Sequence, residues 1–544
     1  MSVDPPSSDQ VPSDQSLVAA ARAWLAVDPD PETRAEIESL LERQDMPALR
    51  DRFGSSLQFG TAGLRGALGG GPNRMNRLVV RRAAAGLARH LGAIDPGCAG
   101  RGVVIGHDAR RGSADFALDT ACVLAAHGIR ALLLPPHVPT PVLAWSVVEM
   151  DAAAGVMVTA SHNPPQDNGY KVYLGDGAQI VPPHDHLIAQ QIEMGDLDVA
   201  LAPSDHSLIE RLGDALVDRY AAFAAGVRLS PGVPGVPVTA TALHGVGGAL
   251  LVEVLGRSGL GAPEVVALQQ QPDPAFPTVA FPNPEEPGAM DAVIELARER
   301  GAVLALANDP DADRLGAAIP LASGAWRRLS GDEIGWLLAD HILSRTTGDD
   351  RLVVTTLVSS SLLQRMATAH GVRHLETYTG FKWIGHAVLE HPDLRFVFGY
   401  EQALGYLVAQ RPLDKDGISA AVMLVEAAAC ALADGETVEQ RLASIRARYG
   451  DLRTAERSIR MAPADAAARV AVLAADPPGQ IGNSRVTGVE HYAEAGLLRL
   501  WCGAVRLQVR PSGTEPKVKL YVEVEGDDPT AWLDPLGELV LGTA

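Results

Sequence analysis

The order of hydrophobic and polar positions predicts that most of this chain alternates between strands and helices. From residue 101 onward, short apolar runs are separated by longer segments with helical periodicity. That alternation is typical of β-α-β units, whose strands are parallel and covered by helices on both faces of a sheet. In the first such region the pattern predicts strands at 101–108, 129–136 and 155–161, and helices at 116–128 and 141–150.

The same succession of elements returns twice further along the chain. The second round predicts strands at 237–242, 265–270 and 302–308 and helices at 249–259 and 290–301; the third predicts strands at 351–360, 372–378 and 394–400 and helices at 361–371 and 381–391. Three α/β units of about 110 residues with different loop chemistry indicate internal structural repetition, although the three sequences are hardly alike.

The two ends of the chain follow other patterns. Helices are expected at 17–27, after Ser16, and at 32–44, after Asp30 and Pro31, which together form an N-terminal arm. After a helix near 437–450, alternating segments predict an antiparallel α+β unit. We therefore expect an α/β protein with mixed sheets, divided into an N-terminal helical arm, three similar α/β domains and a C-terminal α+β domain, at 1–49, 50–207, 208–324, 325–446 and 447–544.

Composition narrows the possible partners and the compartment. Of 544 residues 47% are hydrophobic, and 46 Lys and Arg stand against 66 Asp and Glu, a formal charge of -20 that disfavours nucleic acid and anionic membranes. Four widely spaced cysteines without a CxxC pair argue against zinc knuckles and disulfides and favour a reducing cytoplasm. The acidic first 16 residues resemble a short disordered lead rather than a signal peptide, and the apolar stretch 418–435, interrupted by Glu426, is expected to be a buried helix.

Three acidic side chains follow the predicted strand at 302–308. Asp309, Asp311 and Asp313 occupy alternate positions, so their carboxylates can converge on one point, where they would require a divalent cation. Mg²⁺ is the expected ion. An EF-hand loop would need Gly and Glu where this chain has Arg314 and Pro320. An acidic, solvated turn is the simpler alternative.

The segment RPSGTEP, residues 510–516, has the residues of a phosphate cradle. Its Arg510 can form a bidentate contact with a phosphate, while Ser512, Gly513 and Thr514 can form a small anion-binding nest. An ordinary hairpin turn is the alternative. Four weaker candidates are Arg65 in the Gly-rich loop 59–66, Glu401 after the strand at 394–400, Gly380 with Lys382 in TGFKW, and His244 in LHGVGG; each has a structural reading as a loop, cap or core residue.

The segment TASHNPPQDNGYKVY, residues 159–173, places Ser161 directly after an apolar run, and by itself it is compatible with a simple turn. Together with DPDADR, a Gly-x-Glu loop and RPSGTEP, in that order, it resembles the α-D-phosphohexomutase superfamily over about residues 50 to 530. The resemblance implies four domains around a central cleft and a phosphoryl group carried by Ser161. It also implies Mg²⁺ bound by Ser161 and the three aspartates.

The same resemblance assigns roles around that phosphoserine. His162, Lys171, Arg65 and Arg314 would surround the transferred group, with Lys171 exchanging the proton because neighbouring cations lower its pKa, and His162 as the alternative. Glu401, Lys382, Gly380 and His244 would contact the sugar, and Arg510, Ser512, Gly513 and Thr514 its remote phosphate. The implied reaction interconverts the 1- and 6-phosphates of glucose or mannose, with glucose 1,6-bisphosphate as activator, in a monomer or dimer.

One departure from the superfamily pattern affects the expected sugar. Where many hexomutases have Gly-Glu-x-Ser-Gly, this chain has Tyr400-Glu401-Gln402-Ala403, and Ala403 lacks the hydroxyl that would contact the sugar. FGTAGLRG, LHGVGG, TGFKWIG and LDKDGISAA are similar to a branch that includes phosphopentomutase-like proteins. Phosphopentomutase and glucose-1,6-bisphosphate synthase therefore stay open, as do an aspartyl-phosphate phosphatase and a non-catalytic sugar-phosphate binding protein.

Overall fold

The computed structural model describes residues 13–60, 63–512 and 516–542. It contains two compact units, Met1–Ala318 with Leu407–Glu426 and Ile319–Tyr406 with Ala427–Ala544. The acidic lead expected at the N-terminus falls almost entirely outside the described residues. All four cysteines are buried and free, as expected for a chain without disulfides.

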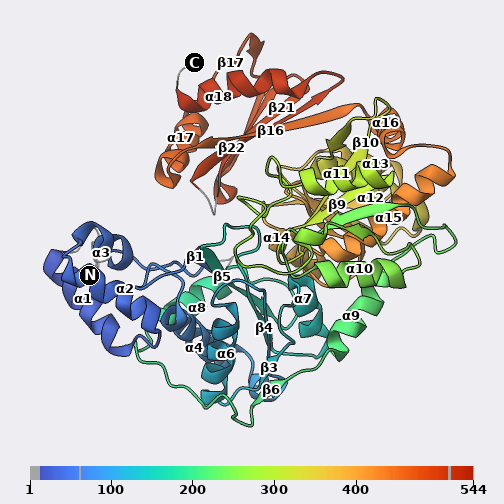
Figure 1. Cartoon of the computed structure of the whole chain (residues 1–544). Coiled ribbons are helices and arrows are strands. Elements are labelled where there is room, and N and C mark those ends of the chain that lie inside the picture. Colours follow the sequence, from blue (N-terminus) through green and yellow to red (C-terminus); the bar gives the residue numbers. More distant parts are fainter. Residues whose placement is uncertain (1–12, 61–62, 513–515, 543–544) are drawn as a thin grey trace. The chain divides into compact units, whose positions relative to one another are not determined.

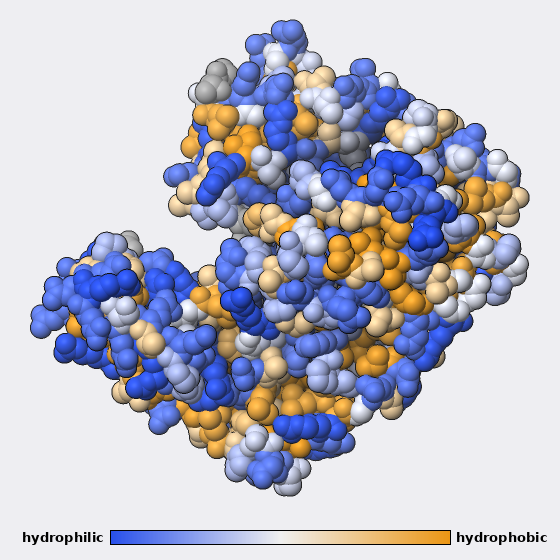
Figure 2. All heavy atoms as spheres, viewed as in Figure 1, coloured by the Kyte–Doolittle hydropathy of each residue, from blue (hydrophilic) through white to orange (hydrophobic). Residues whose placement is uncertain are grey.

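Three helices, rather than the two predicted, form the N-terminal arm: α1 Asp14–Val27, α2 Pro31–Glu42 and α3 Met46–Phe53 (Figure 1). Side chains of Ser13, Asp30 and Asp45 cap them by accepting backbone N–H bonds. The short α3 was missed because only eight residues form it and Pro47 lies at its start. The helices bury a small core of their own, and their surface in Figure 2 is mostly hydrophilic.

The first α/β domain contains a mixed sheet with the order β1-β5-β4-β2-β3-β6. Its four strands β4, β2, β3 and β6 are parallel, whereas β5 and β1 are added antiparallel. The elements are β1 Leu64–Ala67, β2 Val103–His107, β3 Ala131–Leu133, β4 Ala154–Val158, β5 Asp167–Leu174 and β6 Ile209–Arg211, with α4 Arg77–Ile94, α5 Cys98–Arg101, α6 Ser113–Ala126, α7 Thr140–Glu149 and α8 His184–Glu193. The predicted strands and helices are confirmed, because runs such as Val103–His107 are buried on both faces. Strand β5 was missed.

The next two sheets repeat the strand order of the first. Each has its second, first, third and fourth strands side by side: β3-β2-β4-β5, β8-β7-β9-β10 and β13-β12-β14-β15. The elements of these sheets and their helices are β7 Val238–Thr241, β8 Glu264–Val265, β9 Leu304–Asn308, β10 Leu315–Pro320, β11 Trp326–Arg328, β12 Arg351–Thr356, β13 Arg373–Thr377, β14 Arg395–Glu401 and β15 Gly405–Leu407, with α9 Ala215–Ala225, α10 Gly248–Arg257, α11 Asp291–Arg300, α12 Gly331–Arg345, α13 Leu362–Ala369 and α14 Phe381–Glu390. The predicted internal repetition is confirmed. The strand expected at 265–270 is mostly a 3₁₀ turn, Ala267–Gln269.

The three motif-bearing loops occupy the same place in this repeat, between its third and fourth strands. They are 159–166 between β4 and β5, 309–314 between β9 and β10, and 402–404 between β14 and β15. Each contains one non-glycine residue in the left-handed region: Ser161 at φ 50°, Ala312 at φ 56° and Leu404 at φ 61°. Such a conformation costs about 1–2 kcal/mol for an L-residue, so each of these three loops contains one strained backbone position.

The C-terminal domain is an antiparallel sheet with the order β16-β22-β21-β20-β19. Its strands are β16 Leu452–Arg460, β19 Gly488–Tyr492, β20 Leu497–Cys502, β21 Val505–Pro511 and β22 Lys517–Glu525, and α17 Pro463–Ala475 and α18 Leu533–Leu541 share its core. The chain reaches it through α15 Gly417–Ala433 and α16 Val438–Tyr449. In the described residues no single helix has the length and apolar composition to cross a membrane; α15 and α16 pass that test only as a pair bent by 88°.

A buried carboxyl in α12 predicts a pH-dependent stability. Asp332 accepts hydrogen bonds from Ser360 N at 2.8 Å and Tyr400 Oη at 2.9 Å, yet burial raises the pKa of Asp332 to about 6. Its folded pKa lies above the unfolded value of about 3.9, so the folded state binds the proton more tightly. Stability is then full below about pH 4 and falls as the pH rises through about 6, by about 2–3 kcal/mol.

Asp332→Asn is expected to remove that loss, because the hydrogen bonds from Ser360 N and Tyr400 Oη go to Oδ1, an atom that Asn retains. In thermal unfolding the variant should gain stability over the parent between pH 4.5 and 7.5. The exposed Asp349→Asn serves as control. A difference between variant and parent that does not change with pH contradicts the prediction.

Candidate active site

The hydroxyl of Ser161 lies in a buried polar cluster rather than in a solvent-exposed turn. Ser161 follows β4 by three residues and is only 3% exposed. Its Oγ donates to Asp309 Oδ2 at 2.7 Å and lies 3.2 Å from His162 Nδ1. The Thr159 hydroxyl accepts from Ser161 N at 2.9 Å and so supports the left-handed turn. The side chain is thereby directed at the loop 309–314.

Asp309, Asp311 and Asp313 converge in that loop as the alternate spacing predicts. One ligand oxygen of each lies within 4.8 Å of the others, and all three side chains are buried. The left-handed Ala312 tightens the loop, and Asp309 Oδ1 accepts from Arg314 N at 3.0 Å. An acidic, solvated turn is excluded, because these carboxylates are at most 1% exposed.

Two lysines neutralise part of this negative charge. Lys171 Nζ, from β5, lies 2.7 Å from Asp311 Oδ2 and 2.8 Å from Asp313 Oδ2. Lys415 Nζ lies 3.1 Å from Asp313 Oδ2 and 3.3 Å from Asp414 Oδ1. The two ammonium groups therefore lie at the Asp311 and Asp313 side of the cluster, away from the Asp309 carboxyl that contacts Ser161.

The pKa values of the aspartates follow this uneven distribution of charge. Burial, then the charges of Asp313 and Asp311, raises the pKa of Asp309 well above its usual range. Burial would also raise the pKa of Asp313, but Lys171, Lys415 and Arg314 outweigh it and hold that pKa well below its usual range. The charge of Arg314 acts against the rise at Asp309 but does not outweigh burial and the two neighbouring carboxylates.

The residues present fit a hard divalent cation. Asp311 Oδ1 and Asp313 Oδ1 are buried and, within the part of the chain that the structure describes, accept no hydrogen bond. Such buried acceptors without a donor are costly. Carboxylate and hydroxyl oxygens are the ligands that Mg²⁺ prefers. A cation here would satisfy both orphaned oxygens and offset the negative charge of the three carboxylates.

The expected lowering of the Lys171 pKa is wrong. Burial lowers the pKa of Lys171, but the carboxylates of Asp311 and Asp313 outweigh burial and raise it above its usual value. By contrast, burial and the charges of Arg314 and Arg65 hold the pKa of His162 well below its usual value. These directions favour the ammonium form of Lys171 and the neutral imidazole of His162.

Arg65 and Arg314 both belong to this neighbourhood. Arg65, on β1, donates from Nη1 to Asn163 Oδ1 at 3.3 Å in the Ser161 loop. Arg314, the residue after Asp313, forms an ion pair with Glu285 at 3.4 Å. The structure therefore unites all the residues that the sequence predicts for the catalytic and metal positions.

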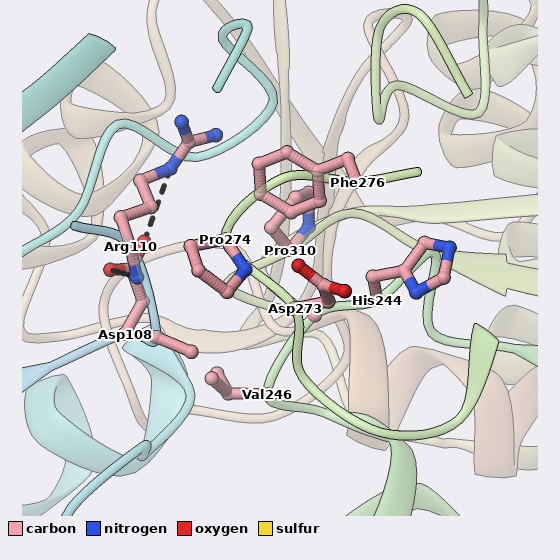
Figure 3. A pocket seen from close by; sticks show the side chains of 10 residues that line it. Asp108, Arg110, His244, Val246, Asp273, Pro274, Phe276 and Pro310 are labelled. Atoms are coloured by element: carbon pink, nitrogen blue, oxygen red, sulfur yellow. Dashed lines mark hydrogen bonds and ion pairs between the residues drawn. The ribbon is translucent and has the colours of Figure 1, made fainter. Parts of the chain in front are cut away.

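The motif LHGVGG packs closely against the aspartate loop. A Cβ on Gly245 would come within 2.4 Å of Pro310 Cα, and one on Gly247 within 2.5 Å of Ala312 Cβ, so both glycines permit close packing. Val246 N donates to Pro310 O at 2.8 Å. His244 itself bonds through Nε2 to Thr278 Oγ1 at 2.8 Å, and Figure 3 shows its ring pointing away from Arg110.

Comparison with known proteins identifies the family. Models described as phosphoglucomutase/phosphomannomutase α/β/α domains I, II and III match residues 56–198, 219–321 and 330–449, and the C-terminal domain model matches 434–532. A "Probable phosphomannomutase" of Haemophilus influenzae is 40% identical, with 84% of this chain and 94% of that protein aligned. The chain belongs to the phosphoglucomutase/phosphomannomutase family. It is accordingly a mutase, an intramolecular phosphotransferase of the isomerase class.

Two further relatives of the mutase agree with this assignment. A "Probable phosphoribomutase" of Schizosaccharomyces pombe is 35% identical over 92% of this chain and 93% of its own length. The crystal structure of a phosphoglucomutase/phosphomannomutase family protein from Burkholderia thailandensis aligns with a TM-score of 0.69 at 20% identity, covering 89% of this chain and 97% of that chain. The latter supports the fold, and the expected four-domain α/β architecture with mixed sheets is confirmed.

The second unit contains the remaining predicted residues of the mutase. Glu401, at the end of β14, accepts from Gly380 N at 3.0 Å, so these two residues lie together, and Lys382 follows in the first turn of α14. Arg510 is the penultimate residue of β21, where its Nε donates to Ala495 O at 3.4 Å, and Ser512 N donates to Lys517 O at 2.8 Å. Gly513 and Thr514 lie outside the described residues.

Three residues of the site were missed in the sequence. Lys415 lies between Asp414 and Asp416 before a buried helix, in a motif that was noted only for its family resemblance. Thr140 begins α7, and its hydroxyl donates to Asp311 Oδ2 at 2.6 Å. Arg110 follows β2 in His107-Asp108-Ala109-Arg110. The carboxyl end of a parallel strand is the signal that could have drawn attention to Arg110.

Proposed function

We propose that this mutase moves a phosphoryl group between the 1-hydroxyl and the terminal hydroxyl of a sugar through a phosphorylated Ser161. The observation that carries the proposal is the 2.7 Å contact between Ser161 Oγ and Asp309 inside a cluster of three buried carboxylates. For stability alone, a hydrophobic residue would suit this buried position at least as well as a serine. It has a clear use if the serine oxygen carries phosphate beside a cation.

The proposed reaction consists of two balanced transfers. In the first, the bond between phosphorus and Ser161 Oγ breaks, a bond from phosphorus to the free hydroxyl of the sugar monophosphate forms, and the proton of that hydroxyl is passed to Ser161 Oγ. The product is a sugar bisphosphate. In the second, Ser161 Oγ takes the other phosphoryl group, a proton returns to the oxygen left on the sugar, and the isomeric monophosphate leaves.

The chain's own residues position and charge this site. His162 is assigned to proton exchange, because its Nδ1 lies 3.2 Å from Oγ, while Lys171 is occupied by Asp311 and Asp313. Phosphoryl transfer passes through a loose transition state, so cationic groups and positioning contribute most of the catalysis. Lys171, Lys415, Arg65 and Arg314 supply such groups.

A metal ion completes the proposed site. Asp309, Asp311 and Asp313, with the oxygen on Ser161, would hold one Mg²⁺. When bound, the ion supplies positive charge to the phosphoryl oxygens. Within the second unit, Glu401 with Gly380 and Lys382 is proposed for the sugar hydroxyls, and Arg510 and Ser512 with Gly513 and Thr514 for the remote phosphate. Glucose 1,6-bisphosphate is the proposed activator that first phosphorylates Ser161.

Incubation with glucose 1,6-bisphosphate and Mg²⁺ tests the proposal directly. Peptide mass spectrometry should place one phosphate on Ser161, and glucose 1-phosphate should then become glucose 6-phosphate with only catalytic bisphosphate present. A requirement for a stoichiometric external phosphoryl donor would favour a bisphosphate synthase. Phosphate on Asp309, Asp311 or Asp313 would favour an aspartyl-phosphate phosphatase and overturn the proposal.

For the sugar, we propose glucose or mannose phosphates, with a pentose phosphate as second candidate. Ala403 in the loop after Glu401 favours the pentose, as does the similarity to a phosphoribomutase. If the missing hydroxyl matters, Ala403→Ser should raise the ratio of kcat/KM for glucose 1-phosphate to that for ribose 1-phosphate about tenfold, the value of one hydrogen bond. Coupled assays with both sugars measure this ratio, and Ala403→Gly is the control. An equal ratio in all three enzymes would rule out Ala403 as a determinant.

A further inference from the structure

A buried guanidinium lies directly behind the Ser161 loop. Arg110 follows β2 and is 4% exposed. It lines a small pocket together with residues of the second α/β domain, among them Phe276 and Pro310 (Figure 3). Pro310 lies between Asp309 and Asp311, so both Arg110 and the aspartate loop border this pocket. No role in the proposed reaction has so far been assigned to Arg110.

Arg110 donates hydrogen bonds to backbone carbonyl groups of the Ser161 loop. Its Nη2 donates to Ser161 O and to Asn163 O, both at 2.6 Å. Its Nη1 donates to Pro164 O at 2.8 Å and Asp167 O at 3.1 Å. One side chain therefore satisfies four carbonyl groups between Ser161 and the first residue of β5. A loop that directs so many carbonyls inward would leave buried acceptors unsatisfied without this cation.

The guanidinium is held from two sides. Asp108 Oδ2 lies 3.3 Å from Arg110 Nε, while Asp108 Oδ1 accepts from Arg110 N at 2.9 Å and from Ser113 Oγ at 2.7 Å. On the other side the ring of Phe276 lies 4.9 Å from the guanidinium carbon, within the range of a cation–π contact. Phe276 belongs to the second domain and adopts φ 46°, a strained conformation for an aromatic residue.

We propose that Arg110 is a positioning residue that shapes the Ser161 loop for phosphoryl transfer, and that Phe276 aligns it with the aspartate loop. The inference rests on the proposed role of Ser161. The four hydrogen bonds hold Ser161 in its left-handed conformation, which directs Oγ toward Asp309. Because Phe276 and the aspartates belong to the same domain, stacking on Arg110 sets the position of the nucleophile relative to the metal ligands.

Arg110→Ala is expected to lower kcat about 100-fold, the loss that a misplacement of about 1 Å can cause, while KM for the sugar phosphate changes less than about threefold. Guanidinium chloride at low millimolar concentration should restore part of the lost kcat, because the ion can enter the vacated pocket. Rescue by guanidinium, absent with sodium chloride, is a result that a merely structural role would not produce. Arg110→Lys should lie between parent and Ala variant, since one ammonium cannot reach four carbonyls.

Two further variants locate the effect. Arg111→Ala removes the exposed neighbouring arginine and should leave kcat unchanged. Phe276→Leu should lower kcat about fivefold, the value of one partly desolvated cation–π contact, without loss of the folded state in thermal unfolding. If Arg110→Ala does not fold, Arg110→Lys and Phe276→Leu provide the same comparison of kcat with KM.

The results separate the inference from the proposed function. Parental kcat in Arg110→Ala, or a loss confined to KM, overturns the positioning role while an inactive Ser161→Ala variant still supports the phosphoserine. A folded Arg110→Ala variant whose lost kcat guanidinium does not restore also overturns it. Undiminished turnover in Ser161→Ala would instead overturn the proposed function, and the inference with it.

Discussion

Ser161→Ala is expected to lower the turnover of glucose 1-phosphate by at least about 10³-fold, because the variant lacks the oxygen that accepts and returns the phosphoryl group. The substitution removes one atom from a buried position, and the hydrogen bond to Asp309 Oδ2 is lost with it. Asp309 keeps the hydrogen bond that its Oδ1 accepts from Arg314 N at 3.0 Å. The fold should therefore persist.

A coupled assay with glucose 1,6-bisphosphate and Mg²⁺ measures this loss, and thermal unfolding shows whether the variant is folded. Ser207→Ala, an exposed serine of the same domain, is the matched control and should have parental turnover. Mass spectrometry adds a second readout, since no phosphate should remain on the peptide that contains residue 161. A variant that turns over at the parental rate would exclude a phosphoserine mechanism.

Removing divalent cations should lower kcat about 10²- to 10³-fold, equivalent to several kcal/mol of charge stabilisation. The physical reasons are two orphaned carboxylate oxygens, Asp311 Oδ1 and Asp313 Oδ1, and the convergence of three buried carboxylates. Dialysis against EDTA followed by titration with Mg²⁺ measures both the loss and its recovery. Asp311→Asn, which is nearly isosteric, should raise the Mg²⁺ concentration for half-maximal rate at least about tenfold, the value of one charged contact.

The control for this series is Asp205→Asn, an exposed carboxylate of the same unit, which should leave the Mg²⁺ dependence unchanged. Elemental analysis before and after EDTA establishes whether metal has left the protein. Full activity in a sample proven free of metal would contradict a magnesium site. So would an Asp311→Asn variant with the parental Mg²⁺ dependence.

Much of the candidate site could be predicted because its parts are local in the chain. Asp309, Asp311 and Asp313 lie within five residues and follow a strand, so their convergence depends on one tight turn. The serine motif follows β4 in the same way. Both loops join the third and fourth strands of a repeated unit, and the hydrophobic pattern alone indicated that repetition. Strand β5 was not indicated, because Asn168 and Gly169 at its start are typical of a turn.

What could not be predicted depends on residues that are distant in the chain. Lys171 and Lys415 are 244 positions apart by their numbers, yet both contact Asp313. Neighbouring cations in the sequence predict a lowered pKa of Lys171, whereas the two carboxylates within 2.8 Å of its ammonium group reverse the direction. Arg110 and Phe276 likewise form a pair only because two domains pack against each other.

Backbone periodicity and short motifs are properties of neighbouring residues, so the alternation of strands and helices, the family and the chemistry of each loop could be predicted from the amino-acid order. Which charges face one another inside the first unit depends on the folded chain. Electrostatic interactions in a buried site depend on distances of a few ångströms between groups that the chain brings together from far apart. For that reason the protonation of Lys171 and His162, and the part played by Arg110, became accessible only in the folded protein.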